Sequence, residues 1–250
     1  NNVSFTNLRK FDGKKTRKIT LSEISQIAGR AGRHINDGTF GITGECKQLS
    51  SDEIERLEKH EINKIDMLFW RNSKINFDSL DSLVFSLEKK TNNEFLKRSN
   101  DCVDEKVLKY LIKNYNDQKT KYSRDYIKTL WECCQIPDFS KKAYGNHIEV
   151  VKKIFEFLIL KTGKVTNDYM RIQLQYLDRY DGNIDTLTNR ISNVRTWSYV
   201  ANKKGWANNS DYWIERTKYI EDKLSDKLHE ELTKSFVDKR ISVLSRSLKQ

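Results

Sequence analysis

The chain has few of the residues that cross-link small domains or bind metals. Its 250 residues include one proline and four cysteines, with no C-x-x-C spacing. The four histidines are scattered and do not pair with the cysteines, so the sequence predicts no metal site. Thiols this few and unpatterned are typical of a reducing compartment.

Long apolar runs are also absent. The longest, such as residues 154–160, are far too short to cross a bilayer, so no membrane association is expected. No basic region followed by an apolar stretch opens the chain, and secretion is therefore not indicated. The first residue is Asn1 rather than a methionine, which suggests a segment of a longer protein.

Two signatures of an ATP-binding domain are missing as well. A P-loop needs the pattern G-x-x-x-x-G-K-[ST], and residues 162–166 have neither that spacing nor the upstream glycine. No D-E-x-[HD] box follows an apolar strand, since Asp52 and Glu53 open a helical pattern and Asp104 and Glu105 lie in polar sequence. Magnesium and the β- and γ-phosphates therefore have no cradle, and we expect that this chain alone does not hydrolyse ATP.

Positive charge is in excess. Lysine and arginine total 46 against 35 aspartate and glutamate, which gives a net charge of +11 and a pI near 9.3. This bias favours an anionic partner such as nucleic acid. The abundance of lysine, asparagine and isoleucine is also typical of an AT-rich genome, which weakens the inference from charge.

Secondary-structure patterns change along the chain. An alternating stretch at residues 3–5 predicts a strand, and Thr20 with Glu23 forms a capping box for a helix that we expect to run through Ile24 to Ala31. Residues 37–44 predict a turn and a short strand. From a second capping box at Ser50, helical periodicity continues almost to the end, with residues 72–104 as the expected loop or boundary region. The predicted fold class is mainly α.

Further along, three helices have recognisable bounds. One begins at Asn146 and is closed by Gly163, and a second follows the break at Asp181 and Gly182. Apolar residues from Trp213 onward recur at helical spacing and predict a long amphipathic helix in the last fifth of the chain.

Residues 26–33, with the sequence QIAGRAGR, carry the chemistry. Arg30 and Arg33 are three residues apart, so on a helix both guanidinium groups project from one side. Gly29 and Gly32 precede them and let a second surface approach. Fixed guanidinium donors suit a polyphosphate whose charge rises during transfer. The alternative is a solvated basic helix with glycines at a packing contact.

This string resembles motif VI of superfamily 2 helicases, and its form is similar to that of the Suv3-like and Ski2-like RNA helicases. Residues 7–13, 37–41 and 130–139, and the block from 195 to 240, resemble the bacterial Suv3-like branch. The resemblance implies that residues 1–49 end a second RecA-like α/β domain, and that residues 50–250 form an all-helical carboxy-terminal domain beside an RNA channel.

The same resemblance assigns roles to residues. Arg30 and Arg33 would reach the γ-phosphate as catalytic residues, with Arg33 as the arginine finger, and Gln26 and Gly29 would be further nucleotide contacts. ATP and Mg would be held mainly by a missing amino-terminal half. The implied partners are RNA (single-stranded or with a 3′ overhang), an exoribonuclease, and the first RecA-like domain of the same protein. The implied location is the bacterial cytoplasm, with the mitochondrial matrix as the alternative.

Two other clusters have competing interpretations. The basic stretch at residues 9–18 either contacts the RNA backbone or is an exposed loop; its candidate residues are Arg9, Lys10, Lys14, Lys15, Arg17 and Lys18. The aromatics near the end either stack bases or anchor a helical core, and we favour the core for Trp197, Tyr199, Trp206, Tyr212 and Trp213. Buried packing is the simplest interpretation of Cys133 and Cys134.

Two alternatives to a helicase part stay open. One is a non-catalytic helical module that binds RNA or protein, which would have no use for Gln26, Arg30 and Arg33 together. The other is the product of a split helicase gene without activity of its own.

Overall fold

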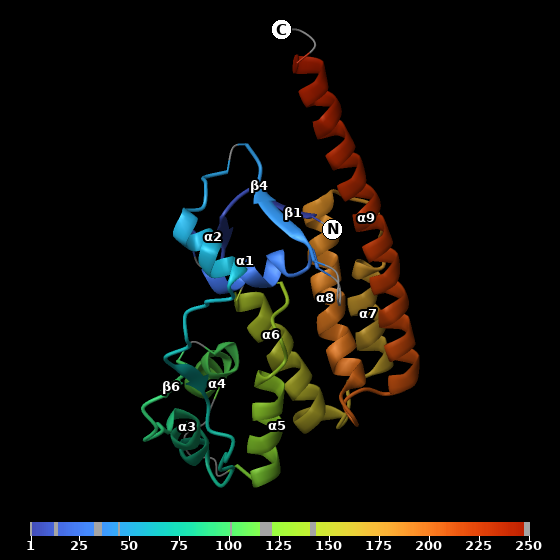
Figure 1. Cartoon of the computed structure of the whole chain (residues 1–250). Coiled ribbons are helices and arrows are strands. Elements are labelled where there is room, and N and C mark those ends of the chain that lie inside the picture. The colour runs from blue at the N-terminus through green and yellow to red at the C-terminus, as the bar shows by residue number, and fades with distance from the viewer. Residues whose placement is uncertain are drawn as a thin grey trace. The chain divides into compact units, whose positions relative to one another are not determined.

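The computed structural model describes residues 2–12, 15–32, 37–44, 46–100, 102–115, 122–140 and 144–247. The chain divides into two compact units (Figure 1). Asn1–Leu68 is called the N-terminal unit, and Phe69–Gln250 is called the helical unit. Among the described residues there are nine α-helices and six short strands, so the fold is mainly α with a small α/β part, as predicted.

The N-terminal unit contains the α/β part. Its strands and helices are β1 (Asn2–Phe5), β2 (Arg9–Phe11), β3 (Thr16–Lys18), α1 (Leu21–Ala28), β4 (Thr39–Ile42) and α2 (Ser51–Glu58). The sequence-distant strands β1 and β4 pair in parallel, with Asn2 opposite Thr39 and Phe5 opposite Ile42. Parallel strands need a crossover, and α1 lies within it. Strands β2 and β3 form an antiparallel hairpin.

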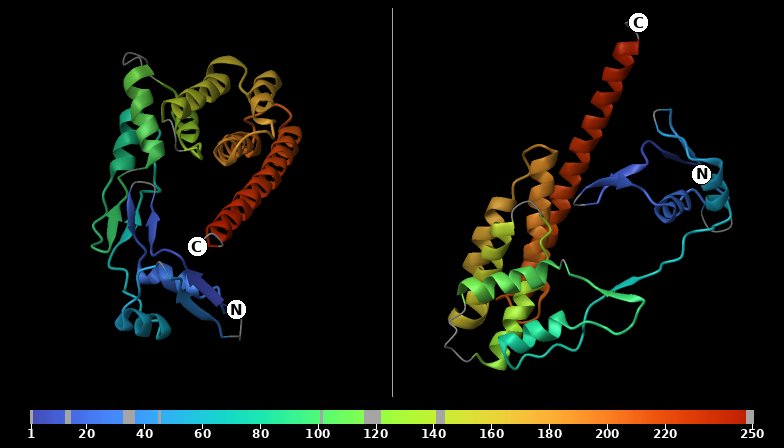
Figure 2. Two further views of the ribbon diagram at one scale, coloured as in Figure 1. Left: turned by 90° about the horizontal axis from the view of Figure 1, so that it is seen from above. Right: turned by 90° about the vertical axis from the view of Figure 1, so that its left-hand side faces the viewer.

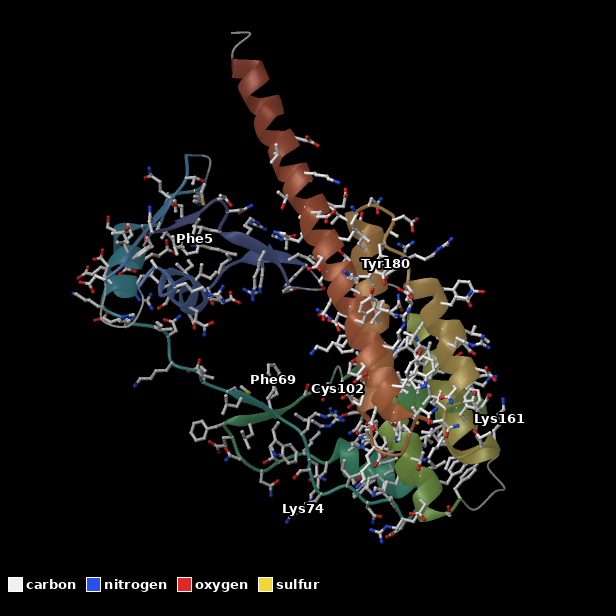
Figure 3. The ribbon with its side chains drawn as sticks, turned by 90° about the vertical axis from the view of Figure 1, so that its right-hand side faces the viewer. Phe5, Phe69, Lys74, Cys102, Lys161 and Tyr180 are labelled. Carbon is white, nitrogen blue, oxygen red and sulfur yellow. The ribbon has the colours of Figure 1, made fainter. Side chains whose placement is uncertain are left out.

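A small apolar core holds this unit together. Ile24 is fully buried on the inner face of α1, and Phe5, labelled in Figure 3, comes from β1. Leu57 of α2 belongs to the same cluster. Both predicted capping boxes are confirmed, at Thr20 for α1 and at Ser50 for α2.

The helical unit follows the boundary. Its elements are β5 (Leu68–Trp70), α3 (Leu80–Glu88), β6 (Leu96–Arg98), α4 (Val103–Tyr115), α5 (Arg124–Cys134), α6 (Tyr144–Phe155), a π-helix η1 (Glu156–Lys161), α7 (Asn167–Leu177), α8 (Ile184–Asn202) and α9 (Ser210–Ser247). Strands β5 and β6 pair with each other. Helices α7, α8 and α9 lie side by side, and α9 continues past the ends of its neighbours (Figures 1 and 2).

One large core spans this unit from α3 to α9. Trp197, Trp206 and Trp213 are buried in it, as predicted, whereas Tyr212 is exposed. The indole nitrogen of Trp213 donates to Asn167 at 2.9 Å, which satisfies its polar group inside the core. Cys133 and Cys134 are also buried, in agreement with the packing interpretation.

Two expectations need correction. Residues 72–104 are not a loop, because they contain α3 and β6. Ser79 caps α3, and Leu83 and Leu87, one turn apart, are buried against the core. In addition, α6 begins at Tyr144 rather than Asn146, and its helical path continues through η1 to Lys161 before Gly163 adopts a φ of 74°.

The division between the compact units lies further along the sequence than residue 49. Helix α2 lies within the N-terminal unit and contacts α1, and the division comes after Leu68. The periodicity change near Ser50 therefore marks the start of α2 rather than the boundary between compact units.

Candidate functional site

Helix α1 carries the first residues of the QIAGRAGR string. Its start is fixed by Thr20, whose hydroxyl accepts from the amide of Glu23, and by Glu23, whose carboxylate accepts from the amide of Thr20 at 2.9 Å. With Ile24 buried, the opposite side of the helix faces outward. Gln26 therefore lies exposed on the surface of the N-terminal unit.

The helix ends earlier than predicted. We expected it to continue through Ala31, but the last helical residue is Ala28 and Gly29 is the C-cap. Beyond it the hydrogen bonds tighten: the amide of Arg30 donates to the carbonyl of Ile27 at 3.1 Å, and the next amide repeats the pattern. Glycine is a poor helix former, and two of them in four residues explain the early end. Arg30 thus lies in a turn and not on a helix face.

Gly38 lies close to the backbone of Ala31 and Gly32, near the end of the string. A Cβ atom added to Gly38 would lie 2.3 Å from the carbonyl carbon of Ala31 and 2.5 Å from the amide nitrogen of Gly32. Both are backbone atoms and neither can swing aside. Only a glycine fits at position 38, and its contact fixes where the chain runs as it leaves Arg30.

Three described residues of the proposed site are exposed together at this end of α1: Gln26, Gly29 and Arg30. Within the described residues, no carboxylate forms an ion pair with Arg30. Its guanidinium therefore keeps its donors available to an anion. Arg33, the proposed arginine finger, lies outside the described residues.

The basic side chains of the β2–β3 hairpin differ from Arg30, because several of them form ion pairs with carboxylates. Glu23 binds two of its cations, with Arg17 in a bidentate pair at 2.8 Å and Lys10 at 2.6 Å. Lys18 pairs with Glu53 at 2.7 Å. The hydrogen bonds from Arg17, Lys10 and the backbone of Thr20 hold the pKa of Glu23 well below its usual range.

These ion pairs divide the predicted RNA-contacting residues. Lys10, Arg17 and Lys18 brace the β2–β3 hairpin against the starts of α1 and α2. Arg9 and Lys15 are exposed and form no ion pair within the described part of the chain. Lys14 lies outside the described residues.

The role of Glu23 was not visible in the sequence. The capping box identified its bond to Thr20, but its pairing with Lys10 and Arg17 depends on how the hairpin folds back. An acid close in sequence to six cations is the one signal that could have indicated such a pairing.

The described residues contain no cluster of three or more histidine, cysteine, aspartate or glutamate side chains that could hold a metal ion. None of the helices in the described part of the chain combines the length and apolarity needed to span a bilayer.

Comparison with curated proteins finds short matches to helicases. Over 55 residues, or 22% of the chain, it is 58% identical to "DExH-box ATP-dependent RNA helicase DExH16, mitochondrial" of Arabidopsis thaliana. Over a stretch of the same length it is 46% identical to "ATP-dependent RNA helicase SUV3, mitochondrial" of Oryza sativa subsp. japonica. A third match, 43% identical over 53 residues, is to "DExH-box ATP-dependent RNA helicase DExH11" of Arabidopsis thaliana.

These matches cover little of either protein. The matched segment spans 9% of the length of the first two relatives and 4% of the third. No protein-family model matches the chain. No solved structure matches it significantly. A region of about a fifth of the chain is therefore related to ATP-dependent RNA helicases.

Proposed function

We propose that this chain is the carboxy-terminal part of an ATP-dependent RNA helicase of the Suv3-like group. It would supply arginine fingers to an ATP site formed with another RecA-like domain, and it would line part of an RNA channel. The single observation that carries the proposal is the QIAGRAGR string, in a chain that also matches named RNA helicases over 53 to 55 residues.

The electrostatics of Arg30 support a phosphate contact. The hairpin cations near Glu23 are neutralised by carboxylates, whereas Arg30 is exposed and has no ion pair within the described residues. A guanidinium that is already paired must lose its partner to bind phosphate, and Arg30 needs no such exchange. The neighbouring Gln26 adds an amide that can hydrogen-bond to nucleotide.

The parallel pairing of β1 and β4 supports the RecA-like assignment. Parallel strands joined through a helix are typical of α/β domains, and a sheet of two strands is marginal by itself. We infer that further parallel strands from a preceding segment complete this sheet. The unit would then contain the end of a larger α/β domain, the second RecA-like domain.

ATP with Mg would supply the phosphoryl group and the energy for unwinding. The residues present could contact the γ-phosphate and border the nucleotide, but they could not hold the metal ion. Arg30 and Arg33 would stabilise the charge that develops on the γ-phosphate, and Gln26 and Gly29 would border the nucleotide. The chain has no sequence match to the P-loop or to the D-E-x-[HD] box, so the first RecA-like domain would hold the metal.

RNA is the proposed nucleic acid because the three matching relatives are named RNA helicases. Two of those names place the relatives in mitochondria, which favours the mitochondrial alternative over a bacterial cytoplasm. Only the family resemblance of the sequence supports an exoribonuclease partner. The same resemblance is the only support for the bacterial branch.

A fluorescence titration of the chain with a labelled single-stranded RNA tests the proposal. We expect weak binding that falls steeply with salt, because each phosphate neutralised releases counterions, and that does not change with ATP and magnesium. Replacing Arg9 and Lys15 together with alanine should weaken binding and lower the salt slope by about 0.7 per lost contact.

The matched control removes the same charge elsewhere in the unit. Lys47 and Lys64 are exposed and lie outside the hairpin, so their double alanine variant should bind nearly as well as the unchanged chain. Binding that is undetectable or insensitive to salt would contradict the RNA-channel role. An RNA affinity that changes strongly with ATP would mean that this chain binds ATP by itself. That result would contradict the assignment of the metal- and phosphate-binding residues to another domain.

A further inference from the structure

A polar cavity in the helical unit plays no part in the proposed nucleotide chemistry. It has a volume of about 250 Å³ and is lined by residues of α6, α7, α8 and the loop after α5. Ligand sites for drug-sized molecules usually enclose about 300–1,000 Å³. This cavity therefore suits a smaller group rather than a whole nucleotide.

His147 of α6 lines the cavity and contributes a buried acceptor. The residue is 6% exposed, and its Nε2 atom has no hydrogen-bond partner among the described residues. The backbone of Ile136 also hydrogen-bonds to the imidazole. Because Nε2 has no partner among the described residues, we assign this bond to Nδ1 as the donor. Nε2 then carries the lone pair. A buried acceptor without a donor is unfavourable and is rarely left so in folded proteins.

The imidazole stays neutral in this position. Burial lowers the pKa of His147, and the nearby charge of Asp138 opposes this shift without reversing it. The Nε2 lone pair is therefore available near neutral pH to a ligand that donates an N–H group.

The rest of the lining is rich in uncharged polar groups. Gln173 of α7 and Thr196 of α8 face the cavity, and Asn193 donates its amide to the carbonyl of Asn189 at 2.8 Å, which leaves its own carbonyl to accept. The indole of Trp197, 4% exposed, adds a flat apolar surface.

Charge excludes a phosphate ligand. The described lining residues include no lysine or arginine, and the charged one is Asp138, whose Oδ1 accepts from the amide and hydroxyl of Ser140. Amides, a neutral imidazole and an indole instead match the edge and face of a heteroaromatic ring.

We propose that this cavity binds a single nucleobase of RNA, with an N–H group of the base donating to Nε2 of His147. The choice of a nucleobase among planar groups with N–H donors rests on the proposed function. Tyr176 is 70% exposed at the cavity rim, where its ring can stack on the base or on its neighbour. The helical unit would thereby contact RNA through a base as well as through its charge.

Nucleosides test this proposal because they carry a base and no phosphate. Adenosine, guanosine, cytidine and uridine are titrated separately into the ¹⁵N-labelled chain, and the His147 Nε2 resonance is followed by NMR. We expect at least one nucleoside to bind and to move that resonance upfield, as hydrogen bonding to a bare ring nitrogen does.

Two variants and one control locate the site. His147→Asn keeps a donor near the Nδ1 position for Ile136 and removes the Nε2 acceptor. Gln173→Ala removes a half-buried amide at the cavity without touching the histidine, so it remains informative if the first variant fails to fold. Each should weaken nucleoside binding roughly 3- to 10-fold, as expected for one lost hydrogen bond. Gln175→Ala, exposed on the same helix and outside the cavity, should bind normally.

Three results would overturn the proposal. They are an Nε2 resonance that no nucleoside moves, binding that both cavity variants leave unchanged, and displacement of the nucleoside by guanidinium, which would indicate a cation site. The assay needs neither ATP nor Arg30 and Arg33. A failure of nucleoside binding would therefore leave the proposed arginine role untouched. Likewise, nucleoside binding could be observed even if Arg30 and Arg33 had no role in ATP turnover.

Discussion

Replacing Gly38 with alanine should displace the QIAGRAGR segment from its position. The added Cβ would lie 2.3 Å and 2.5 Å from backbone atoms of Ala31 and Gly32, well inside van der Waals contact. Because backbone atoms cannot rotate away, the two segments must separate. Overpacking of this kind typically destabilises a protein by about 1–3 kcal/mol.

Hydrogen exchange measured by mass spectrometry reports this loss locally. The amide of Gly29 donates to Ser25 at 2.8 Å and that of Ala31 donates to Ala28 at 2.9 Å, so both are protected only while the turn persists. A destabilisation of about 1–3 kcal/mol corresponds to a loss of protection of roughly 5- to 150-fold, since each 1.4 kcal/mol is tenfold.

A second glycine of the same loop and strand serves as the control. A Cβ added to Gly41, in β4, would have no atom within 4 Å. Gly41→Ala should leave the protection unchanged or raise it slightly, because alanine restricts the unfolded chain. If Gly38→Ala exchanged no faster than Gly41→Ala, the close approach of the loop to Ala31 and Gly32 would be refuted.

Two further predictions concern titrating groups. Burial raises the pKa values of the Cys133 and Cys134 thiols, so both should resist a thiol-modifying disulfide reagent in the native protein and react only after denaturation; fast labelling of either would contradict their packing. The pKa of Glu23 is depressed in the folded state, so its contribution is present above the ordinary glutamate pKa and is lost as pH falls through the lower folded value. The amide of Ile19, which donates to Leu8 across the hairpin, should therefore keep its NMR shift through pH 4 and change only below it, and Glu23→Ala should abolish this acid transition.

Local patterns in the sequence were enough to predict much of the fold. The capping boxes at Thr20 and Ser50 depend on side chains three residues apart, so the sequence alone identifies them. The tryptophans near the end were assigned to a core because large aromatic side chains usually anchor helical bundles, and Trp197, Trp206 and Trp213 are buried. These features depend on residue type or on short spacings, which is why the sequence alone predicts them.

Features that depend on the path of the chain could not be predicted in this way. The close approach of Gly38 to Ala31 and Gly32 brings together residues that are not neighbours in the sequence, and nothing local encodes it. The cavity around His147 combines residues from three helices and a loop, so an isolated histidine gave no signal. The roles of Gln26, Gly29, Arg30 and Arg33 remain predictions, carried by the motif.

The most direct test of the central claim is ATP turnover by a protein that carries this chain after an ATP-binding half. Arg33→Ala should leave ATP affinity within about tenfold and lower RNA-stimulated turnover roughly 10³-fold or more, because an arginine finger acts on charge that develops in the transition state. Arg124→Ala, which removes an exposed arginine of α5, should keep normal turnover. Near-normal turnover in the Arg33→Ala protein would contradict the arginine-finger assignment and, with it, the proposed contribution of this chain to an ATP site.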